Sequence, residues 1–366
     1  HSVGRLMTVV ISRLDKNRIE THGFFASHFF IYNTNETDDE ISSELYRTLE
    51  YVHILPRPDR RKRRAARLAQ TTSNLFPLED MARIITSSQL DILVYPELGM
   101  DALMLLLARE RFAPIQCVFW GHPISQGVAS IDYFLSSDFF EIDEASFTSN
   151  SNAFSSQSFY GEQIIRMEGL STFFPKPQRN QDVKLASSMA SMRRKFGLPS
   201  DAHIYLVPQT LMKFHPTFDD DALVPILLRD AKAFILIPFN PSQSVWQAQL
   251  QQRLNTALRS RMKDSRTILP RAFSRVRFFP TLPHDEFLVL LRFADVVLDP
   301  FPFGGGVTTL EALSMGTPVI TLPIRQTVVR LAAGFMRKIG LASPVLANLT
   351  IPLVVASIED YVTSAL

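Results

Sequence analysis

Residues 295–322 read DVVLDPFPFGGGVTTLEALSMGTPVITL, and this stretch decides the fold. The apolar run 295–298 predicts a buried strand, and the prolines and three glycines after it predict a loop that lets the backbone approach a ligand closely. A helix is expected to begin near Thr308 and to end at Gly316, before a further strand over 319–322. Strand, glycine loop, helix and strand in this order predict part of a parallel α/β sheet.

The beginning of this helix is a predicted phosphate site. The amides of residues 307–310 would point out of the helix N-terminus, where the helix dipole also favours an anion. The hydroxyls of Thr308 and Thr309 would add two donors. A second interpretation stays open, because Thr308 and Glu311 have the spacing of a capping box, in which Glu311 only satisfies amides of its own helix.

A second candidate segment is residues 207–216, VPQTLMKFHP. It follows a predicted strand, so Gln209 and Lys213 would lie at the carboxyl end of that strand, where ligands of parallel sheets bind. Lys213 could offset phosphate charge and Gln209 could donate to a phosphate. The alternative for Lys213 is a solvated loop lysine.

A third segment is residues 113–133, APIQCVFWGHPISQGVASIDY. Gly121, His122 and Pro123 interrupt the chain directly after a predicted strand, so His122 is a candidate for the same edge of its sheet. The alternative is a structural histidine beside a proline turn. Cys117 lies inside the strand and is predicted to be a buried core thiol.

Short apolar runs alternate with helical segments along the rest of the chain, which predicts two α/β domains with parallel sheets and a ligand cleft between them. The domain boundary is expected in the proline- and charge-rich region 171–200, which gives domains of residues 1–178 and 179–366. The other predicted strands are residues 92–95, 116–120, 203–208, 233–238 and 276–279, and a helix is expected over 101–111.

Length and composition bound the class of protein. The chain has 366 residues, of which 46% are hydrophobic and 20% charged, enough for two globular cores. A net charge of +2 gives no bulk-charge argument for a nucleic-acid or membrane partner. The single cysteine excludes an intramolecular disulfide framework and a thiolate zinc site. No apolar run approaches the roughly 18 residues of a membrane span, and a start at His1 without a signal-like segment indicates a fragment or an excised domain.

Together these segments resemble the catalytic region of the O-linked N-acetylglucosamine (O-GlcNAc) transferase family, including its plant SPINDLY-type and bacterial tetratricopeptide-linked relatives. The resemblance implies a GT-B fold, in which two Rossmann-like domains with parallel sheets face a cleft. It also implies an acceptor-side first domain truncated at its start and a nucleotide-sugar-binding second domain truncated at its end. The most specific match is GGGVTTLEALSMGTPVITLP, and the matching stretches in family order are residues 1–4, 91–99, 113–133, 166–177, 208–219 and 276–323.

The implied activity is inverting, metal-independent transfer of GlcNAc from UDP-GlcNAc to Ser/Thr hydroxyls of nuclear and cytoplasmic proteins. No cofactor, metal, nucleic acid or membrane span is expected. Tetratricopeptide repeats, which capture protein substrates in the family, are expected to precede this piece in the full chain.

The resemblance also assigns site residues. Gln209 and Lys213 match residues that hold the diphosphate, Glu311 matches the acid that binds the ribose, and His284 lies in the region that contacts the base. The catalytic assignments are His1, a histidine whose role as a base is disputed within the family, together with His122 and Lys213. The loop and helix start at the phosphates are assigned to Gly305, Gly306, Val307, Thr308 and Thr309.

Two positions depart from the animal enzymes, which have a histidine in place of Gly306 and a threonine in place of Val307. The glycine-rich version resembles microbial and plant relatives, so O-fucosyl transfer from GDP-fucose and O-glucosyl transfer stay open. A sugar-nucleotide 2-epimerase shares the fold, but residues 166–177 and the pair of Gln209 and Lys213 argue against it. The alternative of another class is a non-catalytic nucleotide-sugar-binding or scaffolding module.

Overall fold

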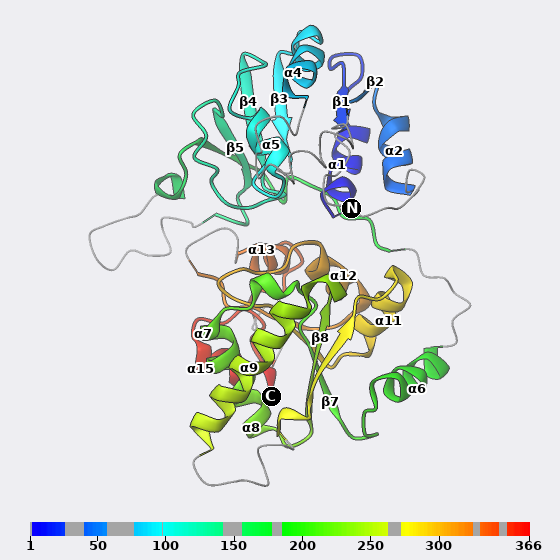
Figure 1. The fold of residues 1–366 in the computed structure, drawn as a ribbon, viewed down its shortest axis with the longest axis vertical. Helices are drawn as coiled ribbons and strands as arrows, with labels where there is room; N and C mark the ends of the chain where they lie inside the picture. The colour runs from blue at the N-terminus through cyan, green and yellow to red at the C-terminus, as the bar shows by residue number, and fades with distance from the viewer. Residues whose placement is uncertain are drawn as a thin grey trace, which may run out of the picture. The chain divides into compact units, whose positions relative to one another are not determined.

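The structure, a computed structural model, divides into two compact units, His1–Phe174 and Pro175–Leu366 (Figure 1). The boundary expected from the sequence lay after residue 178. The described residues are 2–25, 40–56, 77–96, 98–141, 156–177, 185–262, 272–324, 330–343 and 350–366.

The first unit contains a four-stranded parallel sheet in the order β3-β4-β5-β6 and a separate parallel pair, β1-β2. The strands are β1 (His22–Phe25), β2 (Tyr51–Ile54), β3 (Ile92–Tyr95), β4 (Ile115–Phe119), β5 (Tyr133–Ser137) and β6 (Gln163–Met167). The helices are α1 (Ser2–Ser12), α2 (Glu40–Thr48), α4 (Leu78–Ser87) and α5 (Ala102–Leu107), with a 3-10 turn η2 (Ser156–Phe159).

The helix expected over residues 101–111 is shorter than predicted. Asp101 caps α5 by accepting from the amides of Leu103 and Met104 at 2.8 and 3.2 Å, but the helix ends at Leu107. The buried side chain of Gln116 then accepts from the amide of Phe112 at 2.8 Å and donates to the carbonyl of Glu110 at 3.1 Å. Because a polar side chain satisfies these backbone groups, the chain needs no further helical turn there.

The second unit contains a five-stranded parallel sheet in the order β11-β10-β7-β8-β9. The strands predicted in this half are confirmed, with ends that differ by a residue or two. They are β7 (His203–Leu206), β8 (Ala233–Phe239), β9 (Val276–Pro280), β10 (Val296–Leu298) and β11 (Val319–Ile320). The helices are α6 (Leu185–Phe196), α7 (Pro216–Phe218), α8 (Val224–Arg229), α9 (Ser244–Arg261), α11 (His284–Phe293), α12 (Val307–Met315), α13 (Leu331–Lys338) and α15 (Ile358–Ala365), and the short turns are η3 (Leu211–Lys213), the π-helical η4 (Asp219–Leu223) and η5 (Pro241–Gln243).

The strand order places a topological switch point between β7 and β10. The chain builds outward from β7 through β8 to β9, then crosses back to add β10 on the other side of β7. In the register of this pair Val296 lies opposite Tyr205 and Val297 opposite Leu206. The segments that follow β7 and β10 therefore leave the same edge of the sheet as neighbours, which is where ligands of open α/β sheets bind.

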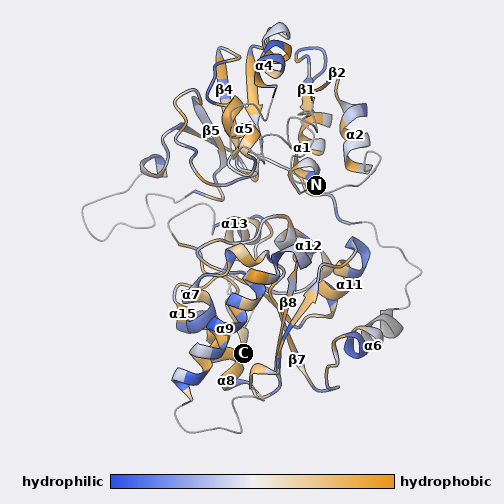
Figure 2. Ribbon diagram, viewed as in Figure 1, coloured by the Kyte–Doolittle hydropathy of each residue, from blue (hydrophilic) through white to orange (hydrophobic). Residues whose placement is uncertain are grey.

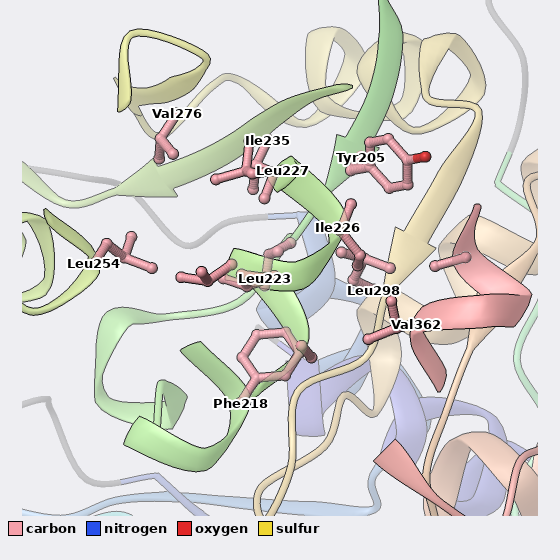
Figure 3. Packing of buried hydrophobic residues seen from close by; sticks show 14 of the residues in the cluster. Tyr205, Phe218, Leu223, Ile226, Leu227, Ile235, Leu254, Val276, Leu298 and Val362 are labelled. Atoms are coloured by element: carbon pink, nitrogen blue, oxygen red, sulfur yellow. The ribbon is translucent and has the colours of Figure 1, made fainter. Parts of the chain in front are cut away.

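Both faces of this sheet are buried, as a parallel sheet requires. One face packs Tyr205, Ile235 and Leu298 against Phe218, Leu223 and other side chains of α7, η4, α8, α9 and α15 (Figure 3). The opposite face packs alternate residues of the same strands, such as Ile204 and Leu236, against α6, α11, α12 and α13. Figure 2 shows hydrophobic residues along β3 and β8 and more hydrophilic ones on α9. No helix among the residues described here is long and apolar enough to cross a bilayer.

Neighbouring leucines of α8 test this core. Leu227 is fully buried, whereas Leu228 is 37% exposed. We expect Leu227→Ala to lower the free energy of unfolding by about 2–5 kcal/mol, through lost burial and the cavity left behind. Leu228→Ala is the matched control and is expected to cost less than about 1 kcal/mol. Urea unfolding measures both, and equal losses would contradict the packing.

Candidate functional site

The candidate site lies at the carboxyl ends of β7 and β10, the switch point of the second unit. The segment after β7 carries Gln209 and Lys213, and the segment after β10 carries Asp299 and the glycine loop that leads into α12. The sequence predicted that these two segments contribute to one site. The parallel pairing of β7 with β10 is what makes them neighbours.

Three predicted residues form a chain of hydrogen bonds here. The Nζ of Lys213 donates to the Oε1 of Gln209 at 2.9 Å and to the carbonyl of Gly304 at 2.8 Å. The Nε2 of Gln209 in turn donates to the Oγ1 of Thr308, on the first turn of α12. Lys213 also lies over the ring of Phe303, 4.5 Å from its centroid. Gln209 is buried and Lys213 is half-buried, so the interpretation of Lys213 as a solvated loop lysine is wrong.

The environment of Lys213 makes its charge sensitive to pH. Burial lowers the pKa of Lys213 to about 8, while the negative charge of Asp299 opposes that shift. Burial likewise raises the pKa of Asp299 to about 6, against the opposing effects of the Gly305 amide, the Thr321 hydroxyl and the charge of Lys213. Between these two values both groups are mainly charged, so at neutral pH the site holds a cation with a buried anion behind it.

The glycine loop allows polar side chains to converge. A Cβ added at Gly305 would come within 2.5 Å of the Nε2 of Gln209, 2.7 Å of the Oγ1 of Thr309 and 3.1 Å of the Oγ1 of Thr308. A side chain at position 305 would therefore force Gln209 and Thr309 to shift, and glycine avoids this. At Gly306 an added Cβ would meet only Leu331, at 3.6 Å.

The start of α12 differs in detail from the prediction. The helix begins at Val307 with Gly306 as its N-cap, so Glu311 is the fifth residue of the helix and not the third, as a capping box needs. The capping-box interpretation is therefore wrong. The amides of Thr309 and Leu310 both donate to the carbonyl of Gly306, at 3.0 and 3.3 Å, which corrects the expectation that all four amides point outward. Val307 and Thr308 supply the amides of the first turn, where no intrahelical acceptor exists.

Glu311 is paired across helices. Its Oε1 lies 2.8 Å from the Nε2 of His284, the first residue of α11, and the Glu311 side chain is 5% exposed against 39% for His284. The two predicted residues thus meet at the packed pair α11 and α12 (Figure 1). A buried carboxylate beside a partly exposed imidazole can accept hydroxyl hydrogen bonds of a ligand. Their assignment to ribose and base stays a prediction.

The first unit holds the remaining predicted residues. His122 lies in the turn after β4, and its carbonyl accepts from the amide of Ile124 at 2.8 Å. The next turn is held by the buried carboxylate of Glu162, which accepts from the hydroxyl of Ser125 and from the amide of Gln126. His122 thus follows a strand of its sheet, as predicted, in a loop whose backbone is hydrogen-bonded. His1 lies outside the described residues.

Sequence reasoning missed residues that organise the second unit's site. Asp299 follows β10 directly, and its carboxylate accepts from the amide of Gly305 and from the hydroxyl of Thr321. The hydroxyl of Tyr361 donates to the Asp299 carbonyl at 3.0 Å. The signal for Asp299 was present in the motif LDP, an acid immediately after a buried strand. Nothing in the pattern indicated that Thr321 and Tyr361 would reach it.

Comparisons with known proteins agree with the resemblance seen in the sequence. No family model matches the chain. The chain is 23% identical over 290 residues to the UDP-glucose:protein N-beta-glucosyltransferase of Actinobacillus pleuropneumoniae, covering 79% of this chain and 40% of the relative. It is 24% identical over 249 residues to the probable UDP-N-acetylglucosamine–peptide N-acetylglucosaminyltransferase SEC of Arabidopsis thaliana, covering 68% of this chain and 22% of the relative.

A solved structure matches the whole chain. It is a mutant of the O-GlcNAc transferase of Thermobaculum terrenum, with a TM-score of 0.66 at 20% identity, covering 100% of this chain and 56% of that one. The predicted GT-B fold class is confirmed, and the chain resembles the catalytic region of O-GlcNAc transferases, as its motifs indicated. The chain spans less than half the length of the two sequence relatives and just over half of the solved one.

The close approach at Gly305 gives a direct test. We expect Gly305→Ala to displace Gln209 from Thr308 and to cost about 1–3 kcal/mol of stability through overpacking. Gly161→Ala is the control for the glycine-to-alanine change itself, because an added Cβ there meets nothing closer than 3.7 Å. Thermal unfolding of both variants measures the difference, and an unchanged melting temperature in Gly305→Ala would contradict the geometry.

Proposed function

We propose that this chain is the catalytic region of a glycosyltransferase that binds a uridine diphosphate sugar in its second unit and transfers the sugar to protein. The observation that carries the proposal is the hydrogen-bonded chain from Lys213 through Gln209 to Thr308, which joins a cation to the N-terminus of α12. A cation and a helix N-terminus that converge on one place attract a diphosphate.

The chemistry of sugar transfer explains why these groups suit it. As the glycosidic bond breaks, negative charge develops on the leaving nucleoside diphosphate. Lys213 and the first amides of α12 can stabilise that charge, because the fold already brings these groups together. We therefore propose that the reaction needs no metal ion.

The acceptor requires a second function. A Ser or Thr hydroxyl has to lose its proton to a base or to the donor phosphate as it attacks. We propose the first unit as the acceptor side, with His122 and His1 as the groups to test for this role. Proteins exposing such hydroxyls are the proposed partners, in the cytoplasm or nucleus.

Two sugars are supported by specific observations. GlcNAc transfer from UDP-GlcNAc is favoured by the likeness to the Thermobaculum terrenum enzyme and to the Arabidopsis thaliana relative, whose names state GlcNAc or N-acetylglucosamine. Glucose transfer is the second candidate, because the Actinobacillus pleuropneumoniae relative is named for UDP-glucose and protein. Both candidates share the uridine diphosphate, so we propose a UDP site in preference to a GDP site.

Calorimetry with UDP and GDP, each with and without EDTA, tests the donor site. We expect UDP to bind at least about tenfold more tightly than GDP, a difference of about 1.4 kcal/mol, and EDTA to have no effect. A preference for GDP would move the proposal to fucosyl transfer. Binding of UDP without transfer from UDP-GlcNAc or UDP-glucose to acceptor protein would favour a non-catalytic binding module.

The pKa of Lys213 gives the expected pH dependence. Lys213 carries its charge below a pKa of about 8 and loses it as the pH rises through that value, so UDP affinity should fall above pH 8. Lys213→Met should weaken UDP binding at pH 7 by roughly 10- to 100-fold, the cost of a charged hydrogen bond. The turnover of Lys213→Met should fall by two to three decades, which is typical when a donor that stabilises transition-state charge is removed.

The variant should also lose the pH dependence between pH 7 and 9. The matched control is Lys232→Met, which removes an exposed lysine that pairs with Asp201. Titration calorimetry at several pH values measures the affinity, and an equal fall with pH in Lys213→Met would remove Lys213 from the site.

A further inference from the structure

The peptide group that joins Gly304 to Gly305 is held at both of its polar ends. Its carbonyl oxygen accepts from the Nζ of Lys213 at 2.8 Å, and its N–H donates to the Oδ1 of Asp299 at 2.6 Å. In a trans peptide the C=O and the N–H point in opposite directions. Lys213 and Asp299 therefore hold this one peptide plane from opposite sides, and their two hydrogen bonds set which way it faces.

Asp299 is itself fixed by the strands and helices around it. It is 3% exposed, its Oδ2 accepts from the hydroxyl of Thr321 at 2.7 Å, and its carbonyl accepts from Tyr361. Thr321 forms a bridge with Val354 beside the end of β11, and Tyr361 is a fully buried residue of α15. The position of the carboxylate is thus set by the core of the second unit and not by the loop that it holds.

A neutral acceptor would be enough to bind one amide. An asparagine at position 299 could accept from Gly305 with the same shape, and burying a charge costs free energy unless an opposite charge compensates it. The opposite charge is Lys213, whose pKa the charge of Asp299 raises. A carboxylate at this position therefore does something that an amide would not do, because it acts on Lys213.

We propose that Asp299 is a positioning residue of the diphosphate site, which orients the Gly304–Gly305 peptide together with Lys213 and supplies the buried negative charge that balances this lysine. The inference rests on the proposed function, since it concerns the same site. In this arrangement the cation offered to the diphosphate depends on a buried anion, Asp299.

The ionisable groups that act on this pair can be named for the described residues. Lys213 on η3 and Asp299 after β10 act on each other, and burial together with the charge of Asp299 raises the pKa of the Tyr361 phenol on α15. Gln209 and Thr321, which also contact the pair, are neutral. Removing the charge of Asp299 therefore removes an influence that raises the pKa of Lys213, and Lys213 should lose its proton at lower pH.

The experiment follows Lys213 directly, by NMR titration of its side chain in protein carrying ¹³C-labelled lysine, with the signal assigned by its absence in Lys213→Met. In Asp299→Asn we expect the titration of Lys213 to move to lower pH, so that its protonated fraction at pH 8 falls about fivefold. Asp295→Asn is the matched control, because Asp295 also accepts a backbone amide, that of Ile204 at 2.7 Å, at the other end of the same strand. The control should leave the Lys213 titration unchanged.

UDP binding by the same variants separates this inference from the proposed function. We expect Asp299→Asn to bind UDP more weakly than the unchanged protein, with a larger loss at pH 8 than at pH 6.5, and Asp295→Asn to match the unchanged protein. The Lys213 titration needs no ligand, so it tests the inference even where the unchanged protein binds no UDP, a result that would overturn the proposed function alone. An unmoved Lys213 titration in folded Asp299→Asn would overturn the inference.

The unchanged protein provides a second test that needs no variant at position 299 to fold. Burial raises the pKa of the Asp299 carboxyl to about 6. The amide signal of Gly305 and the side-chain signal of Lys213 should therefore both show a step near that pH, because one donates to this carboxylate and the other feels its charge. A step in the Gly305 signal without a step at the same pH in the Lys213 signal would overturn the proposal.

Discussion

The candidate site depends on one constraint, the crossover of the chain from β9 back to β10 beside β7. Parallel strands that leave a sheet at the same edge bring their following loops together, and ligands of open α/β sheets bind where the strand order reverses. Lys213 reaches Gly304 and Gln209 reaches Thr308 only because β10 pairs with β7 in this register. A different strand order would leave the same residues on separate parts of the sheet.

The second constraint is electrostatic. Lys213 lies among a phenylalanine ring and backbone groups and is partly desolvated, which disfavours its positive charge. Burial likewise disfavours the negative charge of Asp299. Each offsets part of the cost of the other. At neutral pH this leaves a charged lysine at a helix N-terminus, an environment suited to anions, although the chain as a whole is close to neutral.

The sequence predicted the parts of this arrangement that depend on local pattern. Alternation of strands and helices gave the parallel sheets, and the glycines before Thr308 located the loop and the helix start. Pattern could not decide between a ligand-binding acid and a capping box for Glu311, because both need an acid at that spacing. The structure excludes the capping box, because α12 begins two residues earlier than that motif requires, and the packing of α11 against α12 places His284 beside Glu311.

Long-range contacts explain what sequence reasoning missed. Asp299 binds Thr321 across 22 positions and its carbonyl receives Tyr361 across 62, and neither separation leaves a periodic signal. The local sequence around Lys213 likewise could not show whether this lysine is solvated or half-buried. Burial is a property of the assembled fold, so it becomes visible only when the strands and helices that cover the residue are placed.

The polar groups of the site are hydrogen-bonded to one another. Lys213 donates to Gln209 and Gly304, and Gln209 donates to Thr308, so a diphosphate entering here would exchange these bonds for its own. The net free energy gained for each hydrogen bond is small, because every bond to the diphosphate replaces one that the protein group already makes. What the ligand adds is negative charge, which Lys213 and the first amides of α12 can stabilise further and which neutral partners cannot supply. For this reason a diphosphate that gains charge as its sugar leaves would be held more tightly than the intact donor, and differential binding of that kind is what accelerates a reaction.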